Sequence, residues 1–146
     1  MQRNPVELAD RLRAVFGAKL KDLIESFGEV TIVVNKAVYP DVMGQLRDDS
    51  RFRFEELIDL CGVDYAGYGN EEKGLKGKRF AVVVHLLSLA FNCRLRVRVF
   101  ADDDAMPEVP SIMAIWPAAN WFEREAFDLY GILFKGHPDL RRILTD

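Results

Sequence analysis

Residues that could hold a metal ion are scarce in this sequence. Its 146 residues include only two cysteines, Cys61 and Cys93, and two histidines. Zinc sites and iron–sulfur clusters take about four converging ligands, mostly Cys and His. We therefore expect no metal and no iron–sulfur cluster in this chain. Both cysteines stand in apolar runs without a CxxC spacing, so we interpret them as buried, reduced thiols, with a disulfide as the alternative.

The sequence also lacks the segments that define several other protein classes. The longest stretches free of Lys, Arg, Asp and Glu, residues 80–93 and 109–122, are shorter than the roughly 20 residues of a membrane-spanning helix. A net charge of −3 argues against a general nucleic-acid binder. The GxSxG, GxGxxG, HExxH and Walker motifs are absent. We expect no nucleic acid, no bound cofactor, and membrane contact only through a partner.

The two histidines give little support for catalysis. His85 stands in the most apolar segment of the chain, between Val84 and Leu86, and is interpreted as a hydrogen-bonded core residue rather than a ligand or a base. His137 stands in the sequence GHPD, where it can cap a turn or contact a partner. A lone histidine is weak support for an active site.

Helix signals occur near both ends of the chain. Asn4 followed by proline is typical of a helix start, and apolar residues recur at helical spacing until Gly17. Pro40 and the aspartate after it open a second, short helix. After Pro107 and Pro110 the chain is expected to become helical again, with a break at Pro117 and a restart near Asn120.

Apolar and β-branched runs predict the strands, which fall at residues 30–34, 54–63, 79–89 and 93–100. Residues 64–78 contain four glycines among charged residues and suit a hairpin connection. Three of the strands are expected to run antiparallel. The sequence therefore predicts an α+β fold, a single domain over residues 1–146 with a mixed or antiparallel sheet of four to five strands covered by helices.

The strand at residues 93–100 alternates apolar and cationic side chains, which places Arg94, Arg96 and Arg98 on one face. Two interpretations stay open for this face. It is either a solvated outer surface or a basic ladder that meets an acidic patch on another chain. The acidic turn Asp102–Asp104 can also neutralise the arginines within the chain.

Residues 120–130 (NWFEREAFDLY) are the densest aromatic segment. On a helix, apolar groups would cover roughly two thirds of its circumference. Only Arg124 and Asp128 face clearly away from them, at a spacing that allows pairing. Glu123 and Glu125 fall within the apolar arc, where a carboxylate needs cationic or hydrogen-bonding partners.

Arg141 and Arg142 are candidate partners for these carboxylates if the chain doubles back after the GHPDL turn. Two interpretations compete. In one, a self-contained buried salt-bridge network fixes the C-terminal turn; in the other, the helix is completed only when another subunit covers its wide apolar arc.

The segment EREAFDLYGILFKGHPDLRRILTD, residues 123–146, resembles the signature of the C subunit of bacterial respiratory complex I, which corresponds to the mitochondrial iron–sulfur protein subunit 3. Upstream segments such as LIDLCGVDY and KRFAVVVHLLSL are also similar to this family, so the resemblance covers nearly the whole chain. The candidate residues for a partner interface or signature network are Trp121, Glu123, Arg124, Glu125, Asp128, Tyr130, His137, Arg141 and Arg142.

The resemblance implies a non-catalytic structural subunit of the peripheral arm of the proton-translocating NADH:quinone oxidoreductase. It implies docking on the D subunit, with the iron–sulfur subunits of the arm as neighbours, on the cytoplasmic side of the bacterial inner membrane. The family's C subunit binds no flavin and no iron–sulfur cluster. Electrons pass from NADH to quinone through neighbouring subunits, and this chain would support the quinone-reducing module.

Bacterial relatives usually continue beyond LTD with a long tail that wraps the partner, whereas this chain stops at Asp146, so we expect a truncated chain. The nearest rival is the homologous subunit of a membrane-bound hydrogenase, or of a ferredoxin- or F420H2-dependent dehydrogenase. A rival of another class is a small stand-alone quinone reductase, which would carry a flavin.

Overall fold

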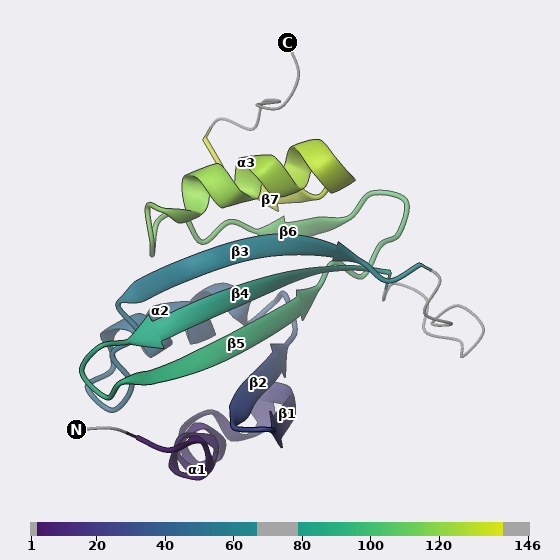
Figure 1. The fold of residues 1–146 in the computed structure, drawn as a ribbon. Coiled ribbons are helices and arrows are strands. Elements are labelled where there is room, and N and C mark those ends of the chain that lie inside the picture. Colours follow the sequence, from purple (N-terminus) through teal and green to yellow (C-terminus); the bar gives the residue numbers. More distant parts are fainter. Residues whose placement is uncertain (1–2, 67–78, 139–146) are drawn as a thin grey trace.

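The computed structural model describes residues 3–66 and 79–138. Its helices are α1 (Pro5–Phe16), the short 3-10 helix η1 (Gly17–Lys19), α2 (Tyr39–Asp48) and α3 (Ala119–Tyr130). Its strands are β1 (Leu20–Ser26), β2 (Glu29–Val34), β3 (Glu56–Asp64), β4 (Phe80–Ser88), β5 (Cys93–Phe100), β6 (Glu108–Pro110) and β7 (Leu133–Lys135). Figure 1 shows their arrangement.

Five strands form one sheet in the order β1-β2-β5-β4-β3. Neighbouring strands are antiparallel except β2 and β5, which run parallel with Thr31 opposite Arg96. The short strands β6 and β7 form a separate parallel pair. The predicted α+β class, with a mixed sheet of four to five strands, is confirmed.

The hydrophobic core lies between the helices and one face of the sheet. In Figure 1, α2 lies behind the sheet, α1 lies near β1 and β2, and α3 runs with β6 and β7 along the side of β3. Each large apolar side chain that becomes buried contributes roughly 1.5–3 kcal/mol. The largest of those fully buried include Tyr39, Phe52, Phe54, Phe134, Leu8, Leu12, Ile32 and Met43.

The opposite face of the sheet, here called the open face, carries the alternate side chains of each strand. On β5 these are the three arginines, and opposite Arg96 lies His85 of β4. Within the described ranges no helix crosses this face in Figure 1. The open face is therefore not covered by any helix that the structure describes.

The start of α1 follows its sequence signals. The Asn4 side chain accepts a hydrogen bond from the Glu7 backbone N–H at 2.9 Å, which satisfies one of the donors left free at a helix start. Gly17 ends the helix with a φ of 51°, a conformation that favours glycine. The predicted helix boundaries are confirmed at both ends.

The helix expected soon after Pro110 is wrong. Residues 108–110 form β6, and the chain then runs through turns until α3 begins at Ala119. Pairing with β7 explains the difference, because Ser111 donates its backbone N–H to Lys135 and Leu133 donates its own to Pro107. The predicted break at Pro117 and restart near Asn120 are confirmed.

The glycine-rich connection predicted at residues 64–78 lies mostly outside the described residues. Its two ends fit a hairpin, because β3 and β4 are antiparallel and Asp64 pairs with Phe80. Within residues 3–66 and 79–138, no helix is long and apolar enough to cross a membrane.

Candidate functional site

Helix α3 is held against β3 by a close approach at Gly62. A Cβ atom at Gly62 would lie 2.8 Å from Cδ2 of Tyr130 and 3.0 Å from Cδ1 of Ile132, distances that real Cβ contacts essentially never show or rarely reach. The helix ends at Gly131, whose φ of 72° is left-handed and whose N–H bonds the Phe127 carbonyl. The absence of a side chain at Gly62 therefore lets the last turn of α3 lie on the strand.

Glu123 anchors the first half of α3 and is fully buried. Its carboxylate accepts a hydrogen bond from the Ser111 hydroxyl at 2.6 Å and another from the Ile112 backbone N–H at 2.9 Å. Burial raises the pKa of Glu123 to about 7, although both hydrogen bonds act in the opposite direction. The prediction that Glu123 needs partners is confirmed, with a hydroxyl and a backbone amide in that role.

Tyr39 of α2 lies in the same buried region. Its hydroxyl has no hydrogen-bond partner in the part of the chain that the structure describes. Burial, and secondarily the charge of Glu123, raise the pKa of Tyr39 well above its ordinary value. Tyr39 is therefore a neutral neighbour of the Glu123 carboxyl, and nothing in the sequence pattern pointed to it.

The outer side of α3 keeps large apolar side chains in solvent. Trp121 is 53% exposed, Leu129 is 58% exposed and Tyr130 is 39% exposed. Aromatic side chains are enriched at protein interfaces. Because the Tyr130 ring packs on Gly62 of β3, we call only Trp121 and Leu129 the outer face of α3.

The remaining predicted site residues do not converge on one point. Arg124, Glu125 and Asp128 are half-buried along α3, and the Nε atom of Arg124 is buried without a hydrogen-bond partner among the described residues. His137 is half-buried in the turn after β7, where its backbone N–H bonds the Phe134 carbonyl.

The proposed partners of the carboxylates, Arg141 and Arg142, lie outside the described residues. The two interpretations of the aromatic helix can therefore be compared only along α3 itself. Burial and hydrogen bonding of Glu123 fit a self-contained anchor, whereas the exposed outer face fits a surface that another subunit covers.

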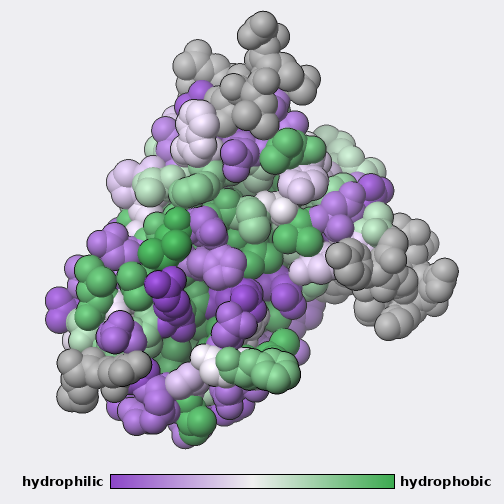
Figure 2. Space-filling model, in the orientation of Figure 1, coloured by the Kyte–Doolittle hydropathy of each residue, from purple (hydrophilic) through white to green (hydrophobic). Residues whose placement is uncertain are grey.

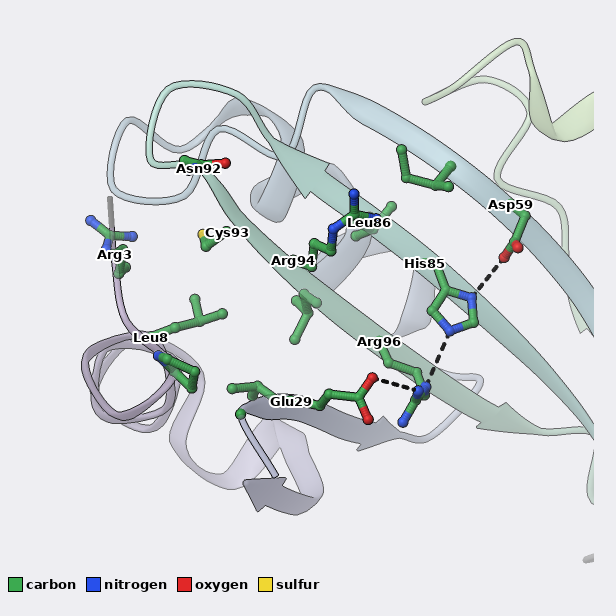
Figure 3. Close-up of a pocket in the computed structure, with 15 residues that line it drawn as sticks. Arg3, Leu8, Glu29, Asp59, His85, Leu86, Asn92, Cys93, Arg94 and Arg96 are labelled. Atoms are coloured by element: carbon green, nitrogen blue, oxygen red, sulfur yellow. Dashed lines mark hydrogen bonds and ion pairs between the residues drawn. The ribbon is translucent and has the colours of Figure 1, made fainter. Parts of the chain in front are cut away.

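A second polar cluster crosses the open face (Figure 3). Arg96 of β5 donates two hydrogen bonds on this face, one from Nη2 to Glu29 of β2 at 3.3 Å and one from Nε to Nε2 of His85 at 3.2 Å. The other ring nitrogen of His85, Nδ1, lies 2.7 Å from Oδ1 of Asp59. Four strands are thus linked through one chain of side chains, here called the cross-strand relay. Arg96 also donates to the Thr31 hydroxyl at 3.2 Å.

The relay fixes the tautomer of His85. Arginine can only donate, so Nε2 of His85 must accept and Nδ1 must carry the proton that bonds Asp59. The interpretation of His85 as a core residue is wrong in one respect, because its side chain is 37% exposed on the open face. The expectation that it is hydrogen-bonded is confirmed.

The relay also answers where Arg96 finds its partners. The partners of Arg96 are Glu29, Thr31 and His85, and not the acidic turn. In that turn, Asp103 accepts a hydrogen bond from a backbone N–H of the turn itself, and Asp104 accepts one from the backbone N–H of Arg79. The alternating sequence of β5 predicts that its arginines lie on one face of the sheet. Their partners on the other strands can be predicted only when the order of the strands in the sheet is known. No local sequence signal contains that order.

The two cysteines are free thiols on opposite faces of the sheet. Cys93 is buried, as predicted, whereas Cys61 is exposed because it lies on the open face of the edge strand β3, opposite Val83. Among residues 3–66 and 79–138, no group of three His, Cys, Asp or Glu side chains is arranged to hold a metal ion.

Comparison with known families gives a match over most of the chain. Residues 32–146 match the family described as the 30 kDa subunit of the respiratory-chain NADH dehydrogenase. The NADH-quinone oxidoreductase subunits C of Burkholderia mallei and Burkholderia pseudomallei are 60% identical over 139 residues, which is 95% of this chain and 68% of theirs.

Solved structures show the same fold. A trypsin-resistant fragment of Nqo5 superposes with a TM-score of 0.76 at 30% identity, over 91% of this chain and 98% of the fragment. A chain of the archaeal membrane-bound sulfane sulfur reductase, a respiratory membrane complex, has a TM-score of 0.74 over 97% of this chain and 77% of its own. At 18% identity, this second likeness concerns the fold alone.

Proposed function

The chain belongs to the 30 kDa subunit family of the respiratory-chain NADH dehydrogenase, complex I, and we propose that within this complex it is a non-catalytic scaffold that docks on the D subunit. Membership makes it a subunit of a multisubunit oxidoreductase. The scaffold role and the D subunit as partner are our inference. The observation that carries it is the outer face of α3, which stays exposed although α3 is anchored from within.

The outer face suits a partner of mainly apolar surface. Trp121 is one of the aromatic types that contribute most to protein interfaces, and Leu129 is exposed on the last turn of the same helix. Because the buried hydrogen bonds of Glu123 already fix α3, the outer face is preorganised and loses little conformational entropy on binding.

We propose that the polar signature residues support this contact. Glu123 positions α3, while Arg124, Glu125, Asp128 and His137 form the polar rim around the apolar centre. Arg141 and Arg142 follow in the sequence and would extend the rim toward the same partner.

Electron transfer is assigned to neighbouring subunits. The whole sequence contains two cysteines, which cannot supply the thiolate ligands of an iron–sulfur cluster, and no dinucleotide-binding motif. We propose that the chain supports the quinone-reducing module as one domain over residues 1–146. Its association with the inner membrane, on the cytoplasmic side, would occur through the complex.

Co-expression of the chain with the D subunit, followed by size-exclusion chromatography, tests the docking. The pair is expected to co-elute without flavin absorbance, and a Trp121→Ala, Leu129→Ala double variant is expected to lose co-elution. Leu89→Ala is the matched control, because Leu89 is 68% exposed in the turn after β4, away from α3. A double variant that binds the D subunit like the control would refute this docking surface.

A further inference from the structure

Strand β5 has an edge without a neighbouring strand. It pairs with β4 along its whole length, from Cys93 opposite Ser88 to Phe100 opposite Ala81. On its other side, the ladder with β2 begins only at Arg96, opposite Thr31. Within the described ranges, residues 93–95 therefore have no strand on the β2 side, and we call this gap the β5 notch.

The notch opens into a pocket of about 550 Å³. On one side lie Arg3 and Leu8, at the start of the chain and in α1, and on the other lie residues 28–30, where β2 begins. In Figure 3, Arg3 and Leu8 lie near the start of β5, and Glu29 lies farther along the same side of the strand. The pocket continues over the open face to the relay, and its volume is within the roughly 300–1,000 Å³ range of ligand sites.

The two arginines near the notch differ in their interactions. Arg96 is held by Glu29 and His85, whereas Arg94 lines the pocket, is exposed, and has no hydrogen bond or ion pair to any residue that the structure describes. Figure 2 views this face and shows hydrophilic residues gathered between hydrophobic ones. Among the described residues, Arg94 is therefore an unpaired cation beside an unpaired strand edge.

Unpaired backbone groups at a strand edge are a template for another extended chain. We propose that an extended, carboxylate-bearing segment of a neighbouring subunit enters the notch as a short added strand along residues 93–95, with an Asp or Glu side chain paired to Arg94. The proposal deepens the scaffold function and rests on it, because it requires the chain to lie within an assembly.

The notch also defines the side-chain pattern of that segment. Side chains of an added strand alternate between the two faces of the sheet. Those on the core side would point toward α1 and the buried Leu95 and should be apolar, whereas those on the open side would meet the exposed Arg94 and should be acidic. Glu29 and Asp59 at the rim disfavour a phosphate polymer as the occupant.

Hydrogen exchange of the assembled complex tests the added strand. The amides of residues 93–95 that point away from β4 are expected to exchange at least about tenfold more slowly in the complex than in the isolated chain. Equal exchange rates in the two samples would overturn the proposal. If only a small anion binds at Arg94, the exchange rates of these amides would also stay unchanged, and that outcome would likewise contradict the added strand.

Zero-length crosslinking identifies the carboxylate. In an Arg94→Lys variant of the complex, carbodiimide is expected to couple the introduced amine to an Asp or Glu of another subunit. The same treatment of the unaltered complex, which has arginine there, is the control and should give no crosslink at this position. A crosslink only to Glu29 or Asp59 of this chain, or no crosslink, would contradict the proposal.

The outcome is separable from that of docking through α3. Loss of D-subunit binding in the Trp121→Ala, Leu129→Ala variant tests the outer face of α3 alone. If the amides of residues 93–95 are protected in the complex while the α3 variant still binds the D subunit, the added strand at the notch is supported and docking through α3 is rejected. The reverse pattern would retain the scaffold function and reject the notch.

Discussion

Glu123 and Ser111 are joined by a hydrogen bond of 2.6 Å that connects α3 to the segment after β6. A second bond, from the Ile112 backbone N–H, occupies the other carboxylate oxygen. Together they fix α3 from its buried side and leave its outer face to solvent. This buried carboxyl group thus holds the first half of α3, while the close approach at Gly62 holds its last turn.

Stability should fall as pH rises from about 4.5 to about 7 and level off above that, because the pKa of Glu123 is raised from its ordinary value of 4.5 to about 7. Between these values the folded chain binds more protons than the unfolded chain, so the contribution is fully present below about pH 4.5 and is lost as pH rises through about 7. The loss is on the order of 3 kcal/mol, since each pKa unit corresponds to about 1.4 kcal/mol. Urea unfolding at pH 5 to 8 measures it.

A Glu123→Gln variant is the control for this titration. Glutamine cannot ionise, and its amide can accept from Ile112 while donating to Ser111. The variant should show a flatter dependence of the unfolding free energy on pH over this range. Parallel curves for the two proteins would mean that Glu123 does not titrate there.

A Gly62→Ala substitution should destabilise the chain by about 1–3 kcal/mol. The added methyl group would lie 2.8 Å from the Tyr130 ring, so the last turn of α3 must move away from β3. Denaturant unfolding measures the change. Gly44→Ala in α2 is the matched control, because the nearest atom its Cβ would meet among the described residues is Cδ1 of Ile115, at 4.0 Å, and alanine favours a helix by about 0.5–1 kcal/mol. Equal effects of the two substitutions would show that α3 does not pack so closely.

The ring proton of His85 should be found on Nδ1, the nitrogen that faces Asp59. Arg96 donates to Nε2, which excludes a proton on that atom while the hydrogen bond persists. Two-bond ¹H–¹⁵N correlation of the imidazole ring distinguishes the two nitrogens directly. In Arg96→Ala the preference should weaken, whereas Lys21→Ala, on the exposed strand β1, should leave it unchanged. Observation of the Nε2–H form in the unaltered protein would contradict the relay.

Strong local patterns predicted much of the fold. Alternation along CRLRVRVF gave β5 with its bounds, and the cap at Asn4 gave the start of α1. Strand β1 was missed because it is an exposed edge strand, whose Leu20, Leu23 and Ile24 have no alternating pattern. Strands β6 and β7 are too short to show a periodicity in the sequence. They form by pairing with each other, although α3 separates them along the chain.

The candidate site was predictable only in part, for a related reason. The apolar arc around Glu123 showed that this carboxyl needs a partner, but Ser111 becomes one only after the chain has turned into α3. The cross-strand relay depends on β2 lying parallel to β5, a contact that brings Thr31 to Arg96 across distant parts of the sequence. Long-range register of this kind leaves no local signal.

The scaffold role is tested most directly by NADH:quinone turnover per assembled complex in a Glu125→Ala variant, with Leu89→Ala as the control. Glu125 is half-buried on α3, so its replacement should weaken binding at the docking surface without changing electron transfer in the neighbouring subunits. We predict a lower yield of assembled complex with unchanged turnover per complex. A variant complex that assembles at normal yield but turns over slowly would contradict the account.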